Sequence, residues 1–148
     1  MIVYLDTSAL VPLLVSEPAS SACGELWDAA DKILTTRLSY VEAVAALAMA
    51  ARMGRITEEE LRAGRAILDE LWAGIDIIEF DDALARAAAD CATRHGLRGY
   101  DAVHCAAALA VRDSTMVAAS GDGSLLEAWR VEGCQVRDTH AQQSPHGR

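Results

Sequence analysis

The sequence predicts one α/β domain built around a central, mostly parallel sheet. Short apolar runs rich in β-branched residues recur along the chain, and each is long enough for one buried strand. Longer segments with apolar residues at the helical period separate these runs. Because parallel strands are joined through helical crossovers, this alternation favours a parallel sheet covered by helices.

Composition limits the class of protein. The chain has 148 residues, of which 52% are hydrophobic, enough for the core of one domain. The net charge is −9, so no overall basic field attracts the chain to nucleic acid or to an anionic membrane. The four cysteines lack the spacing of a zinc site and are expected to be buried thiols in a reducing compartment. With no signal peptide pattern and no apolar run of ~20 residues, we expect a cytoplasmic protein without a membrane partner.

The opening stretch is the most informative local pattern. Residues 2–5 form an apolar run that stops at Asp6, and Thr7 and Ser8 are expected to cap a helix that starts near Ala9. Ligands of open parallel sheets bind beyond the carboxyl ends of the strands, so a carboxylate delivered there by the first strand is a site candidate. A plain capping role for Asp6 is an equal alternative at this point.

The other elements follow in chain order. Further strands are expected at 32–36, 75–80, 115–119 and 134–136. Further helices are expected at 19–30, 43–52, 61–72, 82–95, 102–112 and 125–129. Ser39 and Glu42 match a capping box, which explains Glu42 without any function. We find no linker that would split the domain, which we place at 1–137, followed by a tail at 138–148 that we expect to be disordered.

Four acidic residues fall at the ends of these elements. Asp6 and Asp122 each follow an expected strand, while Glu42 and Asp101 begin helices that follow a strand or a loop. In a right-handed β-α-β arrangement these points collect at one edge of the sheet. Plain alternatives exist here too, since Asp122 suits a turn and Asp101 suits the first turn of a helix.

Such a cluster of carboxylates predicts a cation site. At ~4 Å and an effective dielectric of ~20, each close pair repels by about 4 kcal/mol, unless the carboxyls stay partly protonated or bind a cation. Oxygen ligands favour Mg²⁺ or Mn²⁺. Such a metal activates water and offsets charge on an attacked phosphorus centre, which is the chemistry of phosphodiester hydrolysis.

The order and spacing of these residues resemble the PIN domain family. Asp6 lies in LDTSAL, Glu42 in SYVE, Asp101 in YDAVHCAAA, and Asp122 follows ASG. Together with the chain length, the pattern is similar to the VapC-type toxins of bacterial toxin–antitoxin pairs. The resemblance covers 1–137 and implies a three-layer α/β/α sandwich with a sheet of four to five strands.

The resemblance implies an endoribonuclease with Mg²⁺ or Mn²⁺ held by the acidic quartet of Asp6, Glu42, Asp101 and Asp122. Asp6 and Asp101 are the expected direct ligands. Thr7 or Ser120 is expected to support the site through hydrogen bonds. One feature departs from the family pattern: Gly121 and Gly123 flank Asp122, where a basic or polar residue usually follows the aspartate.

The resemblance also implies macromolecular partners. These are an RNA substrate, a cognate antitoxin of the VapB type whose C-terminal segment wraps the toxin, and a homodimer within a larger complex. An arginine or lysine of the partner, inserted among the acids, would compete with metal, and the helix pair at 41–73 offers apolar surface to a peptide. Arg37, Arg94 and Arg98 are candidates for RNA backbone contacts, with ordinary solvated charge as the alternative.

Two other functions fit part of the pattern. A catalytically inactive PIN-like module would act by binding a partner, but all four acids are retained. A phosphatase with Asp6 as nucleophile would need a second carboxylate where Ser8 stands. His104, one helical turn beyond Asp101, is expected to pack in the core rather than to bind a metal. The sequence therefore favours the metal-dependent ribonuclease.

Overall fold

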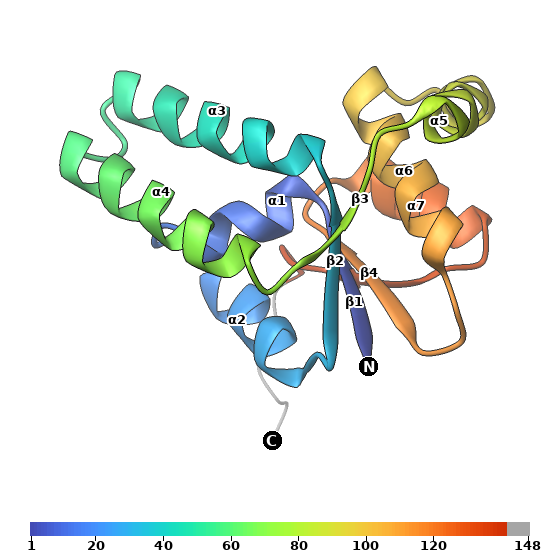
Figure 1. Ribbon diagram of the computed structural model, residues 1–148, viewed down its shortest axis with the longest axis horizontal. Coiled ribbons are helices and arrows are strands. Elements are labelled where there is room, and N and C mark those ends of the chain that lie inside the picture. Colours follow the sequence, from blue (N-terminus) through green and yellow to red (C-terminus); the bar gives the residue numbers. More distant parts are fainter. Residues whose placement is uncertain (142–148) are drawn as a thin grey trace.

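In the computed structural model, which describes residues 1–141, a five-stranded sheet lies between two layers of helices (Figure 1). The strand order is β3-β2-β1-β4-β5, and all four neighbouring pairs are parallel. The strands are β1 (Ile2–Leu5), β2 (Lys32–Thr36), β3 (Asp76–Ile78), β4 (Met116–Ser120) and β5 (Gln135–Asp138). The structure therefore confirms the expected α/β/α sandwich.

The helices divide into two layers, and each layer packs its own hydrophobic core on one face of the sheet (Figure 1). The first layer holds α1 (Thr7–Leu10), the 3-10 turn η1 (Val11–Leu13), α2 (Ser20–Ala29), α3 (Leu38–Arg52) and α4 (Glu58–Trp72). The second layer holds α5 (Asp82–His95), α6 (Gly99–Val111) and α7 (Gly123–Val131). In β1, Val3 and Leu5 pack in the core of the first layer, which we call the first core, and Tyr4 packs in the second core, that of the second layer. Successive side chains of a strand point to opposite faces of the sheet, which explains this alternation. Both faces are covered, so β1 is apolar throughout.

The central position of β1 brings the expected site residues to one edge of the sheet. The chain order moves outward from β1 to β2 and β3 on one side, and to β4 and β5 on the other. The crevice of an open α/β sheet lies at such a switch point, beyond the carboxyl ends of the strands. Asp6 follows β1 at this point, and its backbone N–H donates to the carbonyl of Ala119 in β4 at 3.2 Å. The ends of β1 and β4 are thus joined directly beneath the site.

One local interpretation from the sequence was wrong. Ser39 and Glu42 form no capping box, because α3 already begins at Leu38, with Arg37 at its N-cap and no side-chain cap. Ser39 is buried, and its hydroxyl lies 2.6 Å from that of Thr35 instead. The capping pattern was matched by residues that lie inside the helix, so Glu42 is left without a capping role.

The C-terminal boundary also lies beyond the expected one. Asp138 ends β5, and Thr139 is buried with its backbone N–H donating to the carbonyl of Ser120 at 3.0 Å. The domain therefore continues past residue 137. The rest of the expected tail, 142–148, lies outside the described residues.

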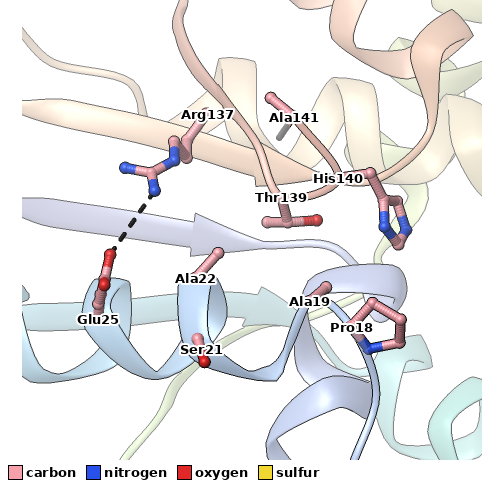
Figure 2. Close-up of a pocket in the computed structure, with 9 residues that line it drawn as sticks. All are labelled: Pro18, Ala19, Ser21, Ala22, Glu25, Arg137, Thr139, His140 and Ala141. Carbon is pink, nitrogen blue, oxygen red and sulfur yellow. Dashed lines mark ion pairs between the residues drawn. The ribbon is translucent and has the colours of Figure 1, made fainter. Parts of the chain in front are cut away.

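A cavity of about 330 Å³ lies between α2 and the segment that follows β5 (Figure 2). Arg137 faces Glu25 across it at 3.8 Å, and the Thr139 side chain lies between them and His140 (Figure 2). None of the four acidic residues lines this cavity. Within residues 1–141, no helix has the length and apolar character needed to span a bilayer.

Candidate active site

Asp6 is the most deeply placed of the four acidic residues, with only 4% of its surface exposed. It is the N-cap of α1, where its Oδ1 accepts a hydrogen bond from the backbone N–H of Ala9 at 3.0 Å. The cap is therefore Asp6 itself, and not the hydroxyl of Thr7 or Ser8. Burial raises the pKa of Asp6, against the opposing effects of positive charge on His104 and of the hydrogen bonds that it accepts.

Two serines fasten Asp6 to the loop that follows β4. Ser8 Oγ donates to Asp6 Oδ1 at 2.7 Å and accepts from the backbone N–H of Gly121 at 2.8 Å. Ser120 Oγ donates to Asp6 Oδ2 at 2.6 Å and accepts from the backbone N–H of Asp122 at 2.9 Å. Both carboxylate oxygens of Asp6 thus have fixed directions, and Asp122 is held next to them. Ser120 was named from the sequence as a candidate supporting residue, whereas Ser8, which makes the bond to the other oxygen, was not.

Asp122 is the N-cap of α7, and its Oδ1 accepts from the backbone N–H of Leu125 at 3.0 Å. The imidazole of His140, from the segment after β5, lies against Gly121, just before Asp122, and a Cβ at that position would lie 2.1 Å from His140 Cδ2. His140 is exposed, so a shift of its ring would make room for a Cβ.

Glu42 lies on α3 and reaches across to the opposite helical layer. Its Oε1 accepts from Thr7 Oγ1 at 3.0 Å and lies 2.9 Å from His104 Nε2 on α6. Burial alone would raise the pKa of Glu42, but the hydrogen bond and charge of His104, with the hydroxyl of Thr7, hold it below its ordinary value. Glu42 is therefore ionised at neutral pH. Sequence reasoning placed His104 in the core correctly but gave no sign of this contact.

Asp101 lies in the first turn of α6, one turn before His104. Burial raises its pKa, and the negative charges of Asp122 and then Glu42 add to this rise, while Arg98 and His104 oppose it. Asp101 thus lies within the electrostatic reach of two other acidic residues. Asp6 and Asp122 are the N-cap residues that follow β1 and β4, whereas Glu42 and Asp101 lie within α3 and α6. We call this region, at the carboxyl ends of β1 and β4, the acidic edge.

The convergence does not close into a compact ligand cage. Among residues 1–141, no three His, Cys, Asp or Glu side chains come close enough together to enclose a metal ion. The chemistry of the donors is nevertheless that of a hard cation, because every acidic side chain offers oxygen. Mg²⁺ usually keeps several waters and uses only one or two carboxylates, so an open arrangement suits it.

The three candidate arginines lie in different surroundings. Arg98 is 88% exposed, and its Nε lies 3.6 Å from Asp101 Oδ2, at the site. Arg37 forms a two-pronged ion pair with Glu79 on the surface. Arg94 donates to Glu132 near the C-terminal end of α7. Only Arg98 of these three contacts a residue of the acidic quartet.

Comparison with known proteins agrees with this architecture. The PIN domain family model matches residues 3–125. Two proteins of Mycobacterium tuberculosis, ribonuclease VapC45 of strain CDC 1551 / Oshkosh and ribonuclease VapC49 of strain ATCC 25618 / H37Rv, are each 42% identical over 135 residues, which is 91% of this chain and 94% of theirs.

Solved structures share the fold at lower identity. PAE2754 from Pyrobaculum aerophilum superposes with a TM-score of 0.67 at 23% identity, over 92% of this chain and 83% of that one. VapC20 from Mycobacterium tuberculosis, a toxin that cleaves the sarcin-ricin loop, superposes with a TM-score of 0.64 at 17% identity, over 85% and 94% of the two chains. By its sequence, over most of its length, the chain belongs to the PIN domain family and is one of its VapC-type members.

Proposed function

We propose that this protein is a metal-dependent endoribonuclease of the toxin type, which hydrolyses phosphodiester bonds of RNA. The proposal rests on the placement of four acidic residues near the switch point of the parallel sheet: Asp6 and Asp122 cap helices just after β1 and β4, and Glu42 and Asp101 lie on α3 and α6. The relatives at 42% identity are named ribonucleases, which supports the same activity for this chain.

Each acidic residue has a role in this proposal. Asp6 and Asp101 would be the principal ligands of Mg²⁺ or Mn²⁺, with Glu42 and Asp122 completing the negative site. Like charge on Asp122 and Glu42 already disfavours ionisation of Asp101, and a divalent cation would relieve that repulsion. When bound, the cation supplies an activated water and offsets charge at the attacked phosphorus centre. Ser8 and Ser120 keep both oxygens of Asp6 oriented towards fixed donors.

RNA binding in this acidic chain has to rely on local positive charge. The chain carries a net charge of −9, so an RNA backbone is not drawn to the molecule as a whole. Arg98 is the best candidate for a phosphate contact, because its exposed guanidinium lies beside Asp101. Arg37 and Arg94 remain weaker candidates, since each already neutralises a glutamate of the chain.

We further propose that a cognate antitoxin inhibits the protein and that the toxin forms a homodimer within a larger complex. Related folds were solved as toxin–antitoxin assemblies, among them VapBC2 from Rickettsia felis bound to a DNA fragment from their promoter, with a TM-score of 0.63 and 13% identity over 93% of this chain and 98% of that one. The apolar side chains of Val41 and Met49 on α3, and of Met53 at its C-cap, are exposed and could receive an amphipathic peptide. An antitoxin arginine could bind two carboxylate oxygens of the acidic edge. Such a pair would act in the cytoplasm.

Cleavage of a labelled structured RNA in the presence of Mn²⁺ tests the nuclease proposal. Asp101→Asn is nearly isosteric, so we expect it to fold, as judged by circular dichroism, and to lose cleavage by orders of magnitude. Asp90→Asn, at an exposed position of α5, is the matched control and should cleave like the wild type. EDTA should abolish cleavage in both the wild type and the control. Full activity of Asp101→Asn, or cleavage that survives EDTA, would contradict the proposal.

A further inference from the structure

His104 connects the two helical layers at the acidic edge. It lies on α6, is 2% exposed, and packs in the second core beside Tyr4. Its Nδ1 lies 2.8 Å from the hydroxyl of Tyr4, and its Nε2 lies 2.9 Å from Glu42 Oε1 on α3. Figure 1 shows α3 and α6 on opposite sides of the sheet. The histidine therefore joins an acidic residue of one layer to the layer that carries Asp101.

The partners of His104 decide which nitrogen carries a proton towards Glu42. An ionised carboxylate can only accept hydrogen bonds, so the Nε2 that faces it carries hydrogen. The Tyr4 hydroxyl can either donate to Nδ1 or accept from it. The orientation of the ring is thus the same whether the imidazole is neutral or protonated. In both states Nε2–H points to Glu42.

The two donors to Glu42 converge on a single oxygen. Thr7 Oγ1 donates to Oε1 at 3.0 Å, His104 Nε2 lies 2.9 Å from the same atom, and Nε2 lies 3.2 Å from Thr7 Oγ1. Among the side chains and backbone groups of residues 1–141, none donates to Oε2. The two donors use both lone pairs of Oε1, so Oε2 is the oxygen of Glu42 that is free to bind a ligand.

We infer that His104 is a positioning residue, which with Thr7 occupies Oε1 of Glu42 and leaves Oε2 as its single metal-binding oxygen. This inference rests on the proposed metal-dependent activity and extends it to residues outside the acidic quartet. Because His104 and Asp101 share one rigid helix, the same contact also sets the position of Glu42 relative to Asp101. Groups that orient metal ligands commonly change metal affinity by roughly 10–100-fold when removed.

A pair of substitutions separates the two hydrogen bonds of the ring. His104→Gln can place its amide nitrogen close to the position of Nε2 and so keep a donor for Glu42. His104→Asn reaches only the position of Nδ1, so it keeps a partner for Tyr4 and loses the donor to Glu42. We expect the Mn²⁺ dissociation constant, measured by isothermal titration calorimetry, to rise about 10-fold in His104→Asn and to stay within about threefold in His104→Gln.

The protein contains a matched control. His95 Nε2 lies 2.8 Å from Glu132 Oε1, and within residues 1–141 neither side chain of this second histidine–glutamate pair is hydrogen-bonded to the acidic quartet. His95→Gln and His95→Asn should leave the Mn²⁺ dissociation constant unchanged. A double-mutant cycle adds a further readout, because His104→Asn should weaken Mn²⁺ binding no further once Glu42→Gln is present. A general loss of packing would weaken binding in both backgrounds.

Several outcomes would overturn the inference. If the wild type binds Mn²⁺ and cleaves RNA, and His104→Asn and His104→Gln bind Mn²⁺ equally well, the inference about His104 is rejected. The proposed ribonuclease function would then still stand. A wild-type protein that neither binds Mn²⁺ nor cleaves RNA would reject the proposed function and this inference together. If the His104 variants do not fold, Thr7→Val removes the other donor to Oε1 from a partly exposed position and should also weaken Mn²⁺ binding. Unchanged affinity in Thr7→Val would then reject the inference.

Discussion

Ser120 Oγ lies 2.6 Å from Asp6 Oδ2, although 114 residues separate the two in the chain. This bond joins the residue that ends β4 to the residue that follows β1. Both groups are buried. The carboxylate therefore depends on one hydroxyl of a neighbouring strand for the direction of its second oxygen.

Removal of that hydroxyl should destabilise the fold. Ser120→Ala leaves Oδ2 of a buried carboxylate without its donor, which costs about 1–3 kcal/mol of the free energy of unfolding. Urea denaturation followed by circular dichroism measures this loss. Ser124→Ala, at an exposed position of α7, removes a hydroxyl that the site does not use and should change stability by less than about 0.5 kcal/mol. Equal stability of the two variants would show that the bond to Asp6 contributes nothing.

The buried carboxyl of Asp6 predicts an unusual pH dependence of stability. Burial raises its pKa in the folded protein above the ordinary value of 3.8. The folded state then binds a proton more tightly than the unfolded state, so this residue lowers stability as pH rises through the folded pKa. In metal-free buffer, Asp6→Asn should therefore be more stable than the wild type at neutral pH. The advantage should shrink as pH falls and be lost below the ordinary pKa.

Thermal melts of both proteins in EDTA, across a pH series, measure this difference. Asp90→Asn again serves as the control, because its carboxyl is exposed and should show no comparable change. A wild type that is more stable than Asp6→Asn at neutral pH, with the gap closing in acid, would reverse the expected sign. It would mean that the hydrogen bonds to the ionised carboxylate outweigh its burial.

Expression in bacteria should reveal the toxin and its partner. We expect the wild type alone to slow growth, and Asp6→Asn to slow it little, because the substitution removes a proposed metal ligand. Co-expression of the neighbouring antitoxin gene should restore growth. Light scattering on the co-purified complex should give a mass larger than one toxin with one antitoxin. A wild type that is harmless and co-purifies with no product of its own operon would contradict the toxin role while leaving the nuclease proposal standing.

Local chemistry allowed much of the fold to be predicted from sequence. Helix α5 spans the expected residues because Asp81 caps its start and Gly96 ends it in the left-handed conformation, with φ of 64°. At α4, Thr57 and Glu60 form a capping box at the start of the helix. These signals act over a few residues, so they can be read without knowledge of the fold.

The same local reasoning failed where tertiary contacts prevail. Ser39 and Glu42 have the spacing of a capping box, yet Ser39 bonds to Thr35 and Glu42 bonds to His104, which is 62 residues away. The domain end was also placed too early, because Thr139 is buried through its contact with Ser120. Spacing within one segment carries no information about which other segment will lie against it.

The sequence by itself determined the alternation of strands and helices, the positions of the four acidic residues at the ends of those elements, and the resemblance to a family. Only the tertiary structure decided which groups donate hydrogen bonds to the carboxylates: Ser8 and Ser120 to Asp6, and Thr7 with His104 to Glu42. The physical reason is the strand order. With β1 between β2 and β4, residues from both helical layers meet above one strand end, and hydrogen bonds that act over about 3 Å then join segments that the chain holds far apart.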